Sequence, residues 1–302
     1  MILLWGSLSD GPMHEVMHLL QERNAPLLII DQKNILQSAI ELEYEDTMSA
    51  GIRYLDHFYD SKNIESAYIR TYDFTKSVNF KEGNTNNEAF VNAFKFEQQM
   101  TSMLEMHPGK IVNRVSTAFS NCSKPYQMDI IKGFGFNVPH TIITSSPDFA
   151  KQFLHQHKKI IYKSISSYRS IVSCLTAQDE DRLNDVACCP TQFQQCVEGT
   201  DYRVHVLGEK IFTTQIISSQ SDYRYARDTQ LIDFKLPSSV EEKCYELTRH
   251  LGLHFSGIDL RCTKENEWYC FEANPSPGYT YFSNGTGQKI TEELTNFLMG
   301  MS

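Results

Sequence analysis

The chain has 302 residues, of which 41% are hydrophobic and 22% are charged, and its formal net charge is −9. This is the composition of a soluble globular protein with room for two or three domains. The acidic balance argues against a nucleic-acid surface, and the sequence has no apolar run of membrane-spanning length and no signal-peptide pattern at its start. The eight cysteines show no disulfide-like or metal-like spacing, so we expect a cytoplasmic protein with reduced thiols.

The first hundred residues predict a small α/β domain. Residues 1–6 form an apolar stretch typical of a strand, a helix-start signal follows at 9–12, and residues 27–30 predict a second buried strand. Strand, helix and strand at this spacing indicate a parallel α/β unit. A further strand is expected at 66–70 and a long helix at 87–106.

One motif in this region suggests a different chemistry. His14-Glu15-Val16-Met17-His18 matches the HExxH pattern of zinc proteases, in which one helix carries two metal ligands and a general base. A zinc site also needs a third ligand, and no downstream histidine or glutamate in a similar helix stands out. We interpret the match as chance and keep a zinc protease as a remote alternative.

The middle of the chain carries two lysines at notable positions. Lys163 lies inside the apolar strand expected near 158–165, and because burying an unpaired lysine is costly, its side chain is expected to face an anion. Lys124 is in the first turn of a helix that begins at Ser123. The pattern leaves open whether Lys124 is solvated or also faces an anion. A polar loop is expected at 166–170.

A hairpin is expected over residues 200–217, with a turn at 207–210. Alternation along its first strand places Asp201, Arg203 and His205 on one face. An acid and an arginine two residues apart form either a structural ion pair or a phosphate site, and the pattern leaves both open. A polar loop follows, then a helix at 240–251 and a closing helix at 291–299.

The stretch 257–279 reads as two strands joined by the turn 264–267. An ordinary hairpin there places Asp259 opposite Glu272, Gly257 opposite Asn274, and Arg261 opposite Cys270. Asp259, Glu272 and Asn274 then share one face, and the other face carries Ile258, Leu260, Tyr269, Phe271 and Ala273. Facing carboxylates repel unless a positive charge lies between them, and this oxygen set suits Mg2+.

These segments in this order resemble the ATP-grasp superfamily, and within it the ribosomal-protein glutamate ligases (RimK-like) and the microviridin-type peptide-cyclising ligases. The most specific part is GIDLR followed by CFEANPSPG, and the resemblance covers the chain from about residue 110 onward. It implies an α/β fold with a small pre-grasp domain at 1–110 and a two-lobed ATP-grasp fold. The central lobe is expected at 111–198, and the C-terminal lobe with the metal site at 199–302.

The resemblance also implies roles for individual residues. Metal ligands would be Asp259, Glu272 and Asn274. The nucleotide would be bound by Lys124, Lys163, Ser167, Arg169, Gln195, Cys196, Val197, Glu198 and Asp201. Arg203, Arg261 and Arg224 would hold the reacting carboxylate or its phosphate. Many relatives carry a glycine-rich loop after the second lysine, whereas this chain has SSYRS there.

The activity implied is ATP-dependent and ADP-forming ligation of a carboxylate to an amine, or to a hydroxyl, through an acyl phosphate. ATP with two Mg2+ ions, or Mn2+ in their place, would be the cofactors. The substrate would be a peptide, a protein tail or an amino acid, and the protein would be a dimer or tetramer. Alternatives on the same fold are a non-catalytic ATP-binding regulator and a small-molecule kinase.

Overall fold

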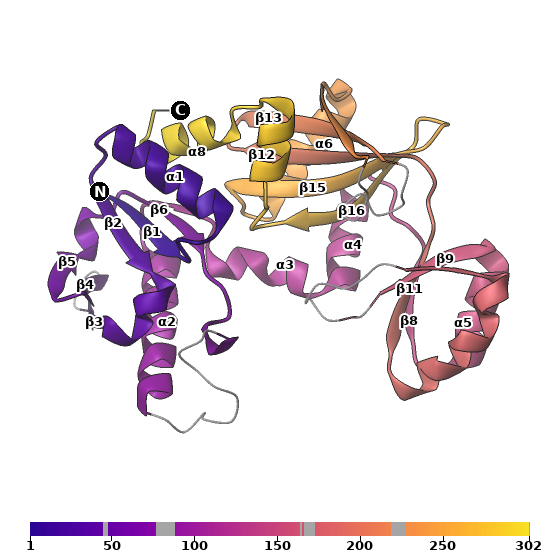
Figure 1. Ribbon diagram of the computed structural model, residues 1–302, viewed down its shortest axis with the longest axis horizontal. Coiled ribbons are helices and arrows are strands. Elements are labelled where there is room, and N and C mark those ends of the chain that lie inside the picture. Colours follow the sequence, from indigo (N-terminus) through magenta and orange to yellow (C-terminus); the bar gives the residue numbers. More distant parts are fainter. Residues whose placement is uncertain (45–47, 77–87, 164, 166–172, 219–227, 302) are drawn as a thin grey trace.

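The computed structural model describes residues 1–44, 48–76, 88–163, 165, 173–218 and 228–301. The first body is a parallel sheet in the order β2-β1-β6-β7 (Figure 1). Its strands and first helix are β1 (Ile2–Gly6), α1 (Gly11–Glu22), β2 (Leu27–Asp31), β6 (Ser66–Arg70) and β7 (Lys110–Val112). Asp10 caps α1 by accepting the backbone N–H of Met13 at 3.2 Å, as expected at a helix start followed by proline.

A second, antiparallel sheet extends this body and was not expected from the sequence. It has the order β3-β4-β5 and packs with the long helix α2. The bounds are β3 (Ser38–Tyr44), β4 (Met48–Tyr54), β5 (His57–Asp60) and α2 (Glu88–Met106), with 3-10 turns η1 (Gln32–Gln37), η2 (Ser61–Asn63) and η3 (Phe74–Lys76). Buried Ile40, Ile52 and Tyr54 join Phe96 and Met100 in one core, so the sheet is an integral part of the first body.

A small lobe at the lower right of Figure 1 is built on the antiparallel sheet β10-β9-β11-β8. Its elements are β8 (Thr141–Thr144), α5 (Pro147–His157), β9 (Lys159–Lys163), β10 (Ser173–Thr176), η5 (Ala177–Cys188) and β11 (Thr191–Gln195). Ile160, Leu175 and Phe193 pack against α5 and η5 in a core of their own. The lobe is therefore a separately packed unit.

The largest sheet is antiparallel with the order β14-β13-β12-β15-β16. Its strands are β12 (Thr200–Leu207), β13 (Lys210–Ile217), β14 (Gln230–Phe234), β15 (Phe255–Cys262) and β16 (Trp268–Asn274). One face packs on α6 (Ser238–His250) through Tyr202, Val204 and Ile258. The predicted alternation along β12 is thus confirmed, and Asp201, Arg203 and His205 lie on the opposite face.

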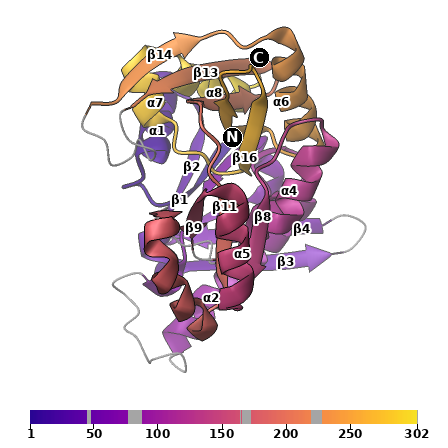
Figure 2. The same ribbon diagram turned by 90° about the vertical axis from the view of Figure 1, so that its right-hand side faces the viewer.

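Short helices connect these bodies. They are η4 (Val115–Ala118), α3 (Phe119–Cys122), α4 (Lys124–Gly133), α7 (Thr280–Thr286) and α8 (Ile290–Leu298). Helix α8 returns to pack beside α1, as both views show (Figures 1 and 2). Leu4, Leu207, Phe255 and Leu294 belong to one continuous core, so the first body and the largest sheet are joined by packing as well as by the chain.

One expected helix face was wrong. The apolar residues Tyr126, Ile130 and Ile131 of the helix that begins at Ser123 predict a buried face, but Tyr126 is 58% exposed. The adjacent Gln127 is buried instead, because its amide binds the backbone of β16.

Within the described residues, no helix has the length and apolar character needed to cross a bilayer.

Candidate functional site

The hairpin of β15 and β16 has the predicted register at its functional end. Asp259 lies opposite Glu272, and Gly257 lies opposite Asn274. Beyond Asp259 the register shifts by one residue, so Arg261 faces Tyr269 and not Cys270 as predicted. This bulge moves Phe271 out of the core and brings Cys270 in, because one extra residue reverses the alternation.

Arg203 on β12 reaches Asp259 on the neighbouring strand. The two residues are direct partners in the β12–β15 pairing, and Arg203 Nη1 donates to Asp259 Oδ1 at 2.5 Å. The guanidinium also lies over the ring of Phe282, 5.8 Å from its centroid. Arg203 is only 7% exposed, so its charge is fixed beside the candidate metal ligand.

His205 accepts a hydrogen bond from Arg203. Its ring is fully buried among Phe255, Tyr279 and Phe282, and its Nε2 accepts from Arg203 Nε at 3.4 Å. Burial, together with the charge of Arg203, lowers the pKa of His205 well below its ordinary value. A neutral ring that accepts at Nε2 carries its proton on Nδ1.

Lys124 reaches the second candidate ligand from helix α4. Its Nζ lies 2.5 Å from Glu272 Oε1 and donates to Asn121 Oδ1 at 3.0 Å. One turn along the same helix, Gln127 donates to the carbonyl of Ala273 at 2.9 Å and accepts from its N–H at 3.1 Å. The amide thus anchors the edge strand next to Glu272. Nothing in the sequence distinguished Gln127 from a surface glutamine.

The donor set fits a hard cation. Asp259, Glu272 and Asn274 place oxygen donors, the donor type that Mg2+ prefers, on two adjacent strands. The two carboxylates are balanced here by Arg203 and Lys124, which a metal with bound phosphate oxygens would draw toward the phosphates. Asn274 Oδ1 accepts the N–H of Ser276 at 2.8 Å, which orients its amide.

The loop after Asn274 is held by the first body. Arg70, at the end of β6, donates from Nη1 to the carbonyl of Pro277 at 2.9 Å and from Nε to Asp10 Oδ2 at 2.5 Å. Tyr72 donates its hydroxyl to the same Asp10 carboxylate at 2.5 Å. This contact occurs where the order of the parallel sheet reverses between β1 and β6, the edge at which α/β sheets usually bind ligands.

Asp201 does not pair with Arg203. It accepts two hydrogen bonds from Arg261, at 2.6 Å from Nε and 2.8 Å from Nη2. Arg261 Nη1 donates to the carbonyl of Val197 at 2.7 Å, and the guanidinium lies 5.4 Å from the centroid of the Phe271 ring. The acid and the arginine on β12 therefore belong to two different ion pairs.

The segment 195–199 joins the small lobe to β12. Val197 is buried, Cys196 is half-buried and Glu198 is exposed. Burial raises the pKa of the Cys196 thiol. Gln195 Oε1 accepts the N–H of His140 at 3.3 Å.

The strand register identifies a further glutamine on the small lobe. Gln194 lies opposite Ile161, so it shares a sheet face with Lys163, two residues further along β9. Gln195 lies opposite Ile160 and has the other orientation. The alternation therefore favours Gln194 over Gln195 as the residue on the lysine-bearing face.

Lys163 is the last residue of β9 and is half-buried, opposite Gln192. Ser167, Arg169 and Arg224 lie outside the described residues. For these residues, and for the other site residues named from the resemblance, the assigned roles remain predictions.

The HExxH residues do not form a site within the described chain. His14 and His18 are exposed on α1, where His18 Nδ1 lies 3.6 Å from Glu22, and Glu15 accepts from the hydroxyl of Thr291 at 2.7 Å. No group of three histidine, cysteine, aspartate or glutamate side chains suited to a metal occurs among the residues the structure describes.

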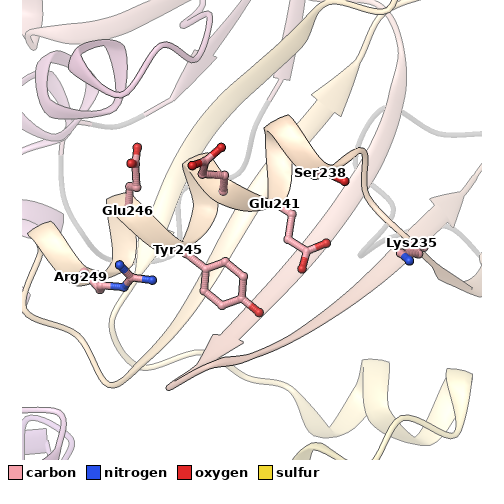
Figure 3. A pocket seen from close by; sticks show the side chains of 7 residues that line it. Lys235, Ser238, Glu241, Tyr245, Glu246 and Arg249 are labelled. Carbon is pink, nitrogen blue, oxygen red and sulfur yellow. The ribbon is translucent and has the colours of Figure 1, made fainter.

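A concavity of about 390 Å3 lies along α6 (Figure 3). Its lining is polar and mixed in charge, and comprises Lys235, Ser238, Glu241, Glu242, Tyr245, Glu246 and Arg249. None of these is a site residue expected from the sequence. Because α6 covers the core face of the largest sheet, the concavity is on the opposite side from Asp259 and Arg203.

The sequence matches one protein-family model and curated proteins. Residues 123–298 match the family described as a RimK-like ATP-grasp domain. N-acetylaspartylglutamate synthase A of Homo sapiens is 24% identical over 208 residues, which cover 64% of this chain and 53% of that protein. The matched region thus spans about half the length of this curated relative.

Solved structures match over nearly the whole chain. The macrocyclase MdnC from Microcystis aeruginosa MRC, bound with precursor peptide MdnA, has a TM-score of 0.83 at 19% identity and covers 98% of each chain. The ATP-grasp ligase PsnB, complexed with Mg, ADP and a phosphomimetic variant of its minimal precursor, has a TM-score of 0.79 at 18% identity. The match covers 99% of this chain and 98% of PsnB. At these identities the likeness concerns the fold.

Proposed function

Because this chain belongs to the RimK-like ATP-grasp family, we propose that it is an ATP-dependent, ADP-forming ligase that joins a carboxylate to an amine or hydroxyl. The observation that carries this proposal is the β15–β16 hairpin, which presents Asp259, Glu272 and Asn274 together with two cations from other elements. In this assignment ATP is a substrate. Asp259, Glu272 and Asn274 would hold two Mg2+ ions, or Mn2+ in their place.

The chemistry has two steps. A substrate carboxylate oxygen attacks the γ-phosphorus of ATP, ADP leaves, and an acyl phosphate forms. The nitrogen or oxygen nucleophile then attacks the acyl carbon, releases inorganic phosphate and loses a proton. Metal ions bound at the carboxylates would neutralise charge on the phosphates.

The protein contributes position and charge. His205 and Phe282 hold Arg203 beside Asp259, so its guanidinium is placed to face the transferred phosphoryl group. Lys124 reaches the other carboxylate from α4 and would turn toward the phosphate chain. This reaction class needs no nucleophilic side chain on the enzyme.

The substrate we propose is a peptide. Two matched structures over nearly the full chain, MdnC and PsnB, are complexes with a precursor peptide or a variant of one. The curated relatives, which include a probable alpha-L-glutamate ligase from Histophilus somni, favour amino-acid addition as the second candidate. Both candidates use the same acyl-phosphate chemistry.

Nucleotide binding is the first test. Ligand near one hundred times its dissociation constant should stabilise the protein by about 2.7 kcal/mol, which raises the melting temperature by several degrees. We expect Mg-ADP to produce this rise in the wild type but not in Asp259→Asn or Glu272→Gln, each compared with its own ligand-free melt. Glu267→Gln, an exposed carboxylate in the hairpin turn, should behave as the wild type.

The catalytic step is then tested by ADP release with candidate peptides and amino acids. A condensed product with stoichiometric ADP supports the ligase, whereas a phosphorylated product would identify a kinase. Binding of Mg-ADP with no turnover of any acceptor would favour a regulator. A melt unaffected by nucleotide but raised by zinc would contradict the proposal.

A further inference from the structure

Arg261 lies at the junction between the small lobe and the metal-bearing sheet. All three nitrogens of its guanidinium donate hydrogen bonds, two of them to Asp201 and the third to the carbonyl of Val197. The side chain is 18% exposed and its charge is matched by a carboxylate that is 23% exposed. A bidentate, partly buried pair of this kind is among the more strongly held contacts in proteins.

The segment 196–199, which connects the small lobe to β12, lies in close contact with β15, the strand that carries Arg261. A side chain at Gly199 would place its Cβ 2.3 Å from the carbonyl oxygen of Cys262 and 2.9 Å from Arg261 Cγ. The next residue, Thr200, already pairs with Cys262. The segment that leaves the small lobe is thus fixed on β15 by backbone contact at Gly199 and by the guanidinium at Val197.

The bulge in β16 completes this arrangement. Because the extra residue turns Phe271 out of the core, its ring comes to lie 5.4 Å from the guanidinium of Arg261. Asp259, two residues before Arg261 on the same strand, faces the same side of the sheet. One strand therefore holds the connecting segment at one end and a candidate metal ligand nearer its middle.

We propose that Arg261 is a positioning residue that fixes the segment 196–199 for the adenosine part of the nucleotide, and that it does not contact the transferred phosphate. This inference rests on the proposed nucleotide site and deepens it. Because each of its three nitrogens already donates to Asp201 or Val197, the guanidinium is oriented toward the connecting segment. Arg203 differs from Arg261, because its guanidinium donates to the candidate metal ligand Asp259.

The test separates the adenosine from the phosphates. Mg-ADP and Mg-pyrophosphate differ by the adenosine, and their dissociation constants can be measured by calorimetry on the wild type and on Arg261→Lys. Lysine keeps the charge but cannot make the bidentate pair and reach Val197 at once. We expect Mg-ADP to bind about tenfold more weakly and Mg-pyrophosphate to be unchanged, since loss of charge-assisted hydrogen bonds at the segment costs about one decade.

Asp201→Asn is the second variant, because it removes the charge of the partner and keeps its shape, and it should show the same selective loss. Arg203→Lys is the matched comparison and should weaken both ligands. Equal weakening of Mg-ADP and Mg-pyrophosphate in Arg261→Lys, or no weakening of either, would overturn the inference while leaving the nucleotide site intact. A wild type that fails to bind Mg-ADP would overturn the proposed function and this inference together.

Discussion

Gly257 lies where the guanidinium of Arg203 crosses β15, and it leaves no space for a side chain. A Cβ there would be 2.3 Å from Arg203 Nη2 and 2.6 Å from Pro277 Cβ. Arg203 is confined by His205 and Phe282 as well, so it cannot simply move aside. The glycine is needed for close approach, and it allows an arginine to lie flat on the strand.

We expect Gly257→Ala to destabilise the protein by about 1–3 kcal/mol, the usual cost of overpacking, and to displace Arg203 from Asp259. Urea denaturation measures the first effect and Mg-ADP binding the second. Gly278→Ala is the matched control, because nothing lies within 4 Å of its added Cβ. If Gly257→Ala binds Mg-ADP as tightly as the wild type, the position of Arg203 matters little for nucleotide binding.

Among the elements, helix α4 holds the edge strand β16, which carries the candidate metal ligands Glu272 and Asn274. Gln127 is 1% exposed and pairs with both polar groups of the Ala273 backbone. Further along the strand, Asn137 pairs with Tyr269 in a parallel bridge. The edge of the sheet is thus covered at both ends, and Lys124 is carried to Glu272 by the same helix.

Replacing Gln127 by leucine should cost about 1–3 kcal/mol of stability, because the N–H and the carbonyl of Ala273 lose their partners while buried. The same change should weaken Mg-ADP binding, because β16 would no longer hold Glu272 at its position beside Lys124. Tyr126→Leu, an exposed neighbour on the helix, should stay within about 0.5 kcal/mol of the wild type. Equal stability of the two variants in urea would contradict this role for Gln127.

At the scale of the molecule, the first body and the largest sheet are joined through Arg70 and Asp10. The Arg70 side chain is 8% exposed and that of Asp10 is 7% exposed, and Arg70 donates to the carbonyl of Pro277 in the loop that follows β16. Burial by itself would raise the pKa of Asp10, but the hydrogen bond and charge of Arg70, with Tyr72 and the N–H of Met13, lower this pKa overall below its ordinary value.

A carboxyl whose folded-state pKa is lowered stabilises the protein above its unfolded-state pKa, and this stabilisation is lost as the pH falls through the folded value. We therefore expect Asp10→Asn to be less stable than the wild type at neutral pH, with a difference that shrinks below about pH 4. Urea denaturation from pH about 3 to 7 measures this difference. Asp129→Asn, an exposed carboxylate on α4, controls for the change in net charge. A difference that is independent of pH would show that ionised Asp10 does not stabilise the domain contact.

The sequence alone determined the alternating faces of β12 and the opposition of Asp259 and Glu272, because a period of two and a short turn are local properties of a strand pair. The family followed from the resemblance of its motifs. The sequence did not show the bulge at Phe271, the burial of Gln127 or the partners of Asp201 and Arg203. The burial of Gln127 and the partners of Asp201 and Arg203 depend on residues 56 to 146 positions apart, which meet only when the sheet, α4 and the connecting segment pack together. The three-stranded sheet β3-β4-β5 was also missed, since its burial comes from α2 and not from its own pattern.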